Sequence, residues 1–132
     1  MRPAANMSTP TSDPALPVVL DPVALARLHD LDPDGSHAVV SRVLGAFETS
    51  LARMLGQLEA GRVDGDVAAV ARVAHTLKSS SASVGALALS AACADVEARL
   101  RGGDGATLLR DIDHLLTHGR AALVAVAAML KA

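Results

Sequence analysis

The clearest pattern in the chain is a stripe of apolar residues that recurs at steps of three and four across residues 37–59. Its members are Val40, Val43, Leu44, Phe47, Leu51, Met54, Leu55 and Leu58. This spacing follows the turn of an α-helix, so one side of the segment should face a core. We expect Ser36 to cap the start of this helix and Gly61 to end it, with Asp64 or Asp66 beginning the next element.

Three more segments show the same period, over residues 67–81, 86–101 and 106–131. Their inward positions are Val67, Val70, Ala74, Leu77 and Ser81 in the first, Leu89, Cys93, Val96 and Leu100 in the second, and Leu108, Ile112, Leu115, Leu116, Leu123, Val126 and Leu130 in the third. A bend at 83–85 and a glycine-rich turn at 102–105 separate them. A shorter helix is expected over 22–29, because Asp21 can cap it and Pro22 suits its first position.

The order of these segments predicts the architecture. Short connections make consecutive helices antiparallel neighbours, so we expect an all-α protein: an up-down-up-down four-helix bundle with an additional short N-terminal helix, spanning residues 21–132. Residues 1–20 carry four prolines interspersed with serine and threonine, and we expect them to form a disordered leader.

Composition supports a helical protein and excludes several classes. The 132 residues are 51% hydrophobic, and alanine and leucine dominate, whereas Ile112 is the single isoleucine and Phe47 the single aromatic residue. The net charge is −2 with scattered basic residues, which disfavours nucleic-acid binding. We expect no membrane span and no signal peptide, since no long apolar stretch is free of charges. Cys93, the single cysteine, favours a reducing, cytoplasmic setting.

Candidate chemistry is concentrated in the third of the five predicted helices. At about 100° per residue, His75 lies roughly 120° from the centre of the apolar stripe, so its ring should be exposed. Arg72, Lys78 and Ser79 lie one turn away on either side. An imidazole is a nucleophile, and a cation one turn away would stabilise an arriving anion, which suits phosphoryl transfer. Taken alone, however, a His-x-x-Lys pair also fits an ordinary solvated helix face.

The residues around His75 and Lys78 help to decide between phosphoryl transfer and an ordinary solvated helix face. The wider stretch reads Ala74-His75-Thr76-Leu77-Lys78-Ser79-Ser80-Ser81-Ala82-Ser83-Val84-Gly85-Ala86, with Leu89, Cys93 and Glu97 following. It resembles the signature of histidine-containing phosphotransfer (HPt) domains of bacterial multistep phosphorelays, and the resemblance extends from about Leu20 onward. The resemblance implies that His75 is the phosphoacceptor, that Lys78 stabilises the phosphate, and that Glu97 orients the imidazole through its inner nitrogen.

The resemblance also implies a docking surface. Gly85 matches the family's glycine near the start of the following helix. Ser79 departs from the pattern, because many members have glycine there, and this affects the choice of partner more than phosphotransfer. We therefore expect Arg72, Ser79, Ala82 and Gly85 to contact a partner.

The implied function is a phosphocarrier that takes a phosphoryl group from one receiver-domain aspartate and passes it to another. Its partners would be receiver domains of response regulators and hybrid histidine kinases, with no nucleic acid and no membrane, and we expect a monomer. No cofactor is expected, because the receivers would supply the magnesium. The chain has no phosphate-binding loop, so it should have no kinase activity of its own. The alternative is a helical module that binds a receiver or kinase without carrying phosphate.

Two other features could carry chemistry. His114 and His118 are four residues apart, with Asp111 before them, a spacing that could bind a metal. No further ligands are evident, so we expect a solvated face and no metal. Cys93 lies on the inward stripe, and we interpret it as a small buried hydrophobe and not a redox thiol.

Overall fold

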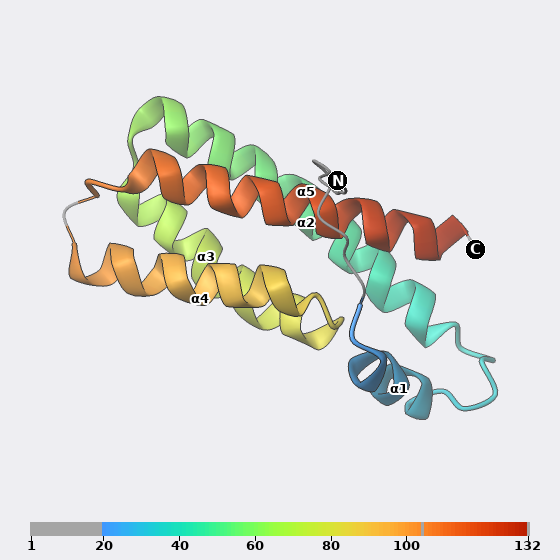
Figure 1. The fold of residues 1–132 in the computed structure, drawn as a ribbon. Helices are drawn as coiled ribbons and strands as arrows, with labels where there is room; N and C mark the ends of the chain where they lie inside the picture. Colours follow the sequence, from blue (N-terminus) through green and yellow to red (C-terminus); the bar gives the residue numbers. More distant parts are fainter. Residues whose placement is uncertain (1–19, 104, 132) are drawn as a thin grey trace, which may run out of the picture.

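The computed structural model describes residues 20–103 and 105–131, which form five α-helices (Figure 1). They are α1 (Pro22–Asp30), α2 (Val39–Asp64), α3 (Val67–Ser83), α4 (Leu87–Gly102) and α5 (Leu108–Lys131). The helices α2 to α5 form a bundle in which α3 packs on α4, α4 on α5, α5 on α2 and α2 on α3, while α1 packs against α2. The predicted fold, an up-down-up-down four-helix bundle with a short N-terminal helix, is confirmed. No helix among the described residues is long and apolar enough to cross a membrane.

The core lies along the axis of the bundle and is built from the predicted stripes. Leu51, Leu58, Leu77 and Ile112 have no exposed surface. Val67, Leu123 and Leu130 are only partly buried, whereas Val73, Ala92 and Ala122 are buried although their positions were not assigned to the core. For most of the apolar residues, the helical period therefore predicted correctly that they face the core.

The prediction that Gly61 ends the second helix is wrong, because α2 continues to Asp64. The helix is capped by Gly65, whose φ of 65° is left-handed and whose N–H donates to the Gly61 carbonyl. Gly61 lies inside the helix and is buried. A Cβ atom there would lie 2.8 Å from Val70 Cγ2, so this glycine allows α2 to approach α3 closely. Asp66 caps α3, accepting a hydrogen bond from the Ala69 N–H.

The prediction that Ser36 caps the start of α2 is also wrong. The N-cap position is Ala38, whose φ is 51°. The carboxylate of Asp32, which is buried, accepts hydrogen bonds from the N–H groups of His37 and Val39. Asp32 thus satisfies one of the free donors at this helix end, the Val39 N–H, from a position seven residues earlier in the chain.

The short helix α1 is fastened to the turn between α3 and α4. Asp21 caps α1 as predicted, accepting from the Ala24 N–H, and its own N–H donates to the Gly85 carbonyl at 2.9 Å. Leu20, the last residue of the expected leader, is buried in the core. Residues 1–19, which make up the rest of the leader, lie outside the described residues.

An ion pair between a buried carboxylate and an exposed arginine connects α4 to α5. The Asp111 carboxylate is 1% exposed and accepts hydrogen bonds from Arg99 Nε at 2.7 Å and Thr107 Oγ1 at 2.8 Å. Both carboxylate oxygens are therefore engaged, as a buried charge requires. The last helix begins at Leu108, two residues later than predicted.

Candidate functional site

His75 projects from the outer side of α3. Its neighbours Ala74 and Leu77 have no exposed surface, and since successive helical residues are rotated by about 100°, the ring turns away from the core. The side chain is 69% exposed. The prediction of an exposed histidine at this position is confirmed.

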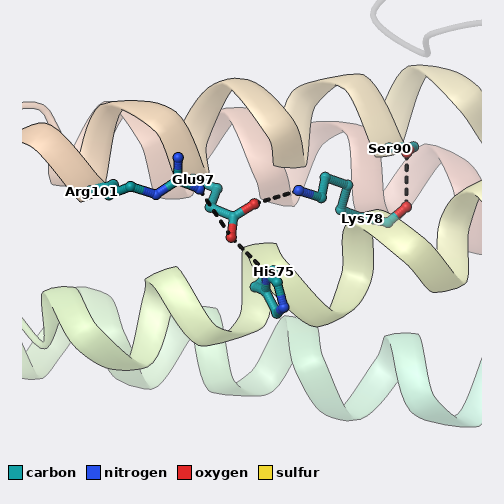
Figure 2. A network of polar contacts seen from close by, with 5 residues as sticks. All are labelled: His75, Lys78, Ser90, Glu97 and Arg101. Carbon is teal, nitrogen blue, oxygen red and sulfur yellow. Dashed lines mark hydrogen bonds and ion pairs between the residues drawn. The ribbon is translucent and has the colours of Figure 1, made fainter.

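A carboxylate from α4 holds one nitrogen of the ring. Glu97 Oε2 lies 2.6 Å from His75 Nδ1, and the Glu97 side chain is 12% exposed (Figure 2). The other oxygen, Oε1, accepts a hydrogen bond from Lys78 Nζ at 2.7 Å. Arg101, one turn further along α4, places Nη2 3.5 Å from Oε2. One carboxylate thus lies between two cations and an imidazole.

These contacts keep Glu97 ionised. The hydrogen bond from Lys78, and then that from His75, lower the pKa of the carboxyl to about 2. An ionised carboxylate can only accept hydrogen bonds, so the short contact requires a proton on Nδ1 of His75. In the neutral ring, the lone pair is then on Nε2, at the exposed side. The site presents an oriented nucleophile to solvent.

Lys78 is fixed at both its side chain and its backbone. Its side chain is 37% exposed, and its ammonium points to Glu97 (Figure 2). Its carbonyl accepts a hydrogen bond of 2.8 Å from Ser90 Oγ on α4. This bond ties the turn of α3 that carries the lysine to the helix that carries Glu97.

Sequence reasoning missed two members of this network. Ser90 gave no signal in advance, because its contact depends on how α3 and α4 are aligned. Arg101 could have been found from its position four residues after Glu97, where oppositely charged helical residues meet.

The structure separates the four residues expected on a docking surface. Arg72, Ser79 and Ala82 are exposed on α3. Gly85, in contrast, is buried, so it does not lie on the exposed surface where a docking residue was expected. It lies in the connection between α3 and α4, where its φ is 83° and its carbonyl accepts a hydrogen bond from the Asp21 N–H, just before α1. The structure gives Gly85 a role in backbone geometry and offers a partner no surface there.

The other candidates form no comparable centre. The rings of His114 and His118 meet edge to face with centroids 4.7 Å apart, and Asp111 is already bound to Arg99 and Thr107. Among the described residues, no group of three metal-ligating side chains could hold an ion. Cys93 has no exposed surface, and burial raises the pKa of its thiol to about 12, as expected for a residue that packs as a hydrophobe.

Comparisons with known proteins bear on this geometry. The Hpt domain family model matches residues 42–132. A search of the curated proteins finds no match. Among solved structures, the chain is similar to the crystal structure of histidine-containing phosphotransfer protein B (HptB) from Pseudomonas aeruginosa PAO1. The TM-score is 0.72 at 23% identity, with 91% of this chain and 97% of that chain covered. At that identity the likeness shows a shared fold.

Proposed function

The chain belongs to the Hpt domain family, and from this premise we propose that His75 accepts a phosphoryl group from the phospho-aspartate of one receiver domain and passes it to the aspartate of another. Membership of the family assigns the chain to phosphotransfer in phosphorelays, as a carrier and not a kinase. The observation that supports the proposal for His75 is the short contact of its Nδ1 with Glu97, which leaves the lone pair of the neutral ring on Nε2 of a side chain that is 69% exposed.

In the proposed transfer, one bond to phosphorus forms as another bond to phosphorus breaks. The lone pair of His75 Nε2 attacks phosphorus, the acyl phosphate P–O bond breaks, and the donor aspartate leaves as a carboxylate. The imidazole ring gains positive charge during this step, and Glu97, on the far nitrogen, stabilises that charge without changing its own protonation state. In the reverse step the acceptor carboxylate attacks phosphorus and the ring recovers its lone pair.

We propose that Lys78 stabilises the negative charge of the phosphoryl group. An ammonium has three donors, and the hydrogen bond to Glu97 engages one of them. The remaining protons can bind phosphoryl oxygens beside His75, one turn away on the same helix. Glu97 then acts as a positioning residue for both side chains.

The supporting experiment uses a receiver domain phosphorylated with labelled phosphate. Wild-type protein should take the label in an acid-labile, alkali-stable form, and His75→Gln should take none while keeping its helical spectrum. Label retained by His75→Gln would place the acceptor elsewhere. A folded wild type that binds receivers but takes no label from any of them would favour the alternative, a module that binds without carrying phosphate.

A further inference from the structure

The phosphotransfer chemistry does not use the buried carboxylate of Asp111, which faces α4 from α5. Glu97 and Arg99 are two residues apart on α4, so their side chains are turned about 200° from one another. Glu97 contacts His75 on α3. Arg99 instead donates a hydrogen bond to Asp111 on α5. The two sides of α4 therefore carry two separate groups of charges.

Asp111 fixes the orientation of the Arg99 guanidinium. The carboxylate is 1% exposed, and Arg99 Nε and Thr107 Oγ1 donate to its two oxygens. Burial of a carboxylate costs desolvation energy that its ion pair does little more than offset, so stability alone does not explain the pair. The Nη groups of Arg99 make no hydrogen bond or ion pair among the described residues, and 45% of the side chain is exposed. The guanidinium is thus held at Nε and free to donate at its other end.

A pocket of about 330 Å³ opens beside this guanidinium. Its lining residues are Arg99, Arg110, Asp111 and His114. Arg110 and His114 are one turn apart on the same side of α5. Arg110 is exposed and has no hydrogen bond or ion pair within the part of the chain that the structure describes. Because Arg99 balances the charge of Asp111, the charge of Arg110 is left without a counterpart and the pocket is positive.

We propose that this pocket binds a phosphate monoester. The Nη groups of Arg99 and the guanidinium of Arg110 donate to the phosphoryl oxygens, and the ring of His114 donates to a further oxygen. Guanidinium groups match phosphate oxygens in shape and charge, and two of them suit a dianion better than a single carboxylate. The pocket volume lies at the lower end of the range for small organic ligands, which favours a mononucleotide over free phosphate. The site lies across α4 from His75, and the ester binds there without reacting.

The test is a titration of the ¹⁵N-labelled protein with adenosine monophosphate, followed by NMR through the backbone amides. Inorganic phosphate and adenosine are titrated in parallel, because each carries only one part of the probe. Arg110→Gln removes the unpaired cation of the pocket. Arg27→Gln is the matched control, because Arg27 is also exposed and has no hydrogen bond or ion pair among the described residues, but lies on α1.

Adenosine monophosphate should shift the amides of residues 99, 110, 111 and 114 in a saturable manner, with a Kd of about 1 mM or lower. Arg110→Gln should raise this Kd by about tenfold or more, since it removes charge-assisted hydrogen bonds. Arg27→Gln should stay within about twofold of wild type. Phosphate binding as tight as that of the nucleotide would support the site and identify free phosphate as the ligand.

Three results would overturn the proposal. They are the absence of saturable shifts, shifts that centre on Lys78 and persist in Arg110→Gln, and equal binding of adenosine. Equal Kd values for Arg110→Gln and Arg27→Gln would also do so.

The contribution of Arg99 is tested without leaving Asp111 unpaired. Arg99→Lys keeps a positive charge for the Asp111 carboxylate but lacks the two Nη groups. Its Kd for adenosine monophosphate should rise by about tenfold, while the urea midpoint of unfolding stays close to that of wild type because the ion pair is kept. An unchanged Kd would remove Arg99 from the site and refute the proposed geometry. Should Arg99→Lys fail to fold, Arg110→Gln decides the matter, since Arg110 is exposed and unpaired among the described residues.

Discussion

The substitution Gly85→Ala tests how the α3–α4 connection is built. Gly85 has a φ of 83°, and a Cβ added there would lie 2.6 Å from the backbone N of Asp21 and 3.0 Å from its carbonyl oxygen. Because these neighbours are backbone atoms, no side-chain rotation relieves the clash. The Asp21 N–H also donates to the Gly85 carbonyl, so any movement that makes room for the methyl group weakens that hydrogen bond.

The expected cost has two parts. An L-residue with a side chain in the left-handed region costs about 1–2 kcal/mol. Loss of the Asp21–Gly85 hydrogen bond costs about 0.5–1.5 kcal/mol. We therefore expect Gly85→Ala to lower the free energy of unfolding by about 1.5–3.5 kcal/mol, measured by urea denaturation followed by circular dichroism.

Gly35→Ala is the matched control. Gly35 has a similar φ of 70°, but a Cβ there would meet nothing within 4 Å. Its substitution should show the backbone strain alone, about 1–2 kcal/mol. A cost for Gly85→Ala no greater than that for Gly35→Ala would refute the close packing of α1 against this connection.

The remaining predictions concern the core and the site. Leu77→Ala should lower the free energy of unfolding by about 2–5 kcal/mol because Leu77 is fully buried; a cost near zero would mean that α3 is rotated from the described position. The pKa of Glu97 is lowered from 4.5 to about 2, so its contribution to stability is complete above pH 4.5 and is lost as the pH falls towards 2. The stability difference between wild type and Glu97→Gln should therefore shrink over that range, and a difference independent of pH would contradict the described contacts. Cys93 should stay unreactive to a thiol reagent until the protein unfolds, and rapid labelling of the native protein would show that it is accessible. Lys78→Ala should slow transfer from a phosphorylated receiver without unfolding the protein, and an unchanged rate would remove its assigned role.

The sequence predicted those parts of the structure that depend on local periodicity. The helices and their buried sides followed from apolar residues at steps of three and four, and the exposure of His75 followed from its angle to that stripe. The cap of α1 was also local, since Asp21 and Ala24 are three residues apart.

Contacts between distant residues were not predictable in this way. Asp32 caps α2 from outside the usual position, because the loop folds back on the helix end. Gly61 is a residue type that often ends a helix, yet here it lets α2 and α3 approach closely. That contact depends on the packing of two helices and cannot be predicted from the residues next to Gly61. Ser90 joins the site because α3 and α4 pack in one particular alignment, which the sequence around Ser90 does not specify. Arg101 differs, since its pair with Glu97 lies within α4 and follows the helical spacing of four residues.

The proposed chemistry of His75 depends most on which atom carries the phosphoryl group. The direct measurement is nitrogen–phosphorus NMR on protein labelled with ¹⁵N in histidine and phosphorylated by a receiver domain. The structure predicts a phosphorus coupling at Nε2 of His75 and a proton retained on Nδ1, held by Glu97. Coupling at Nδ1, or at another of the five histidines of the chain, would contradict it.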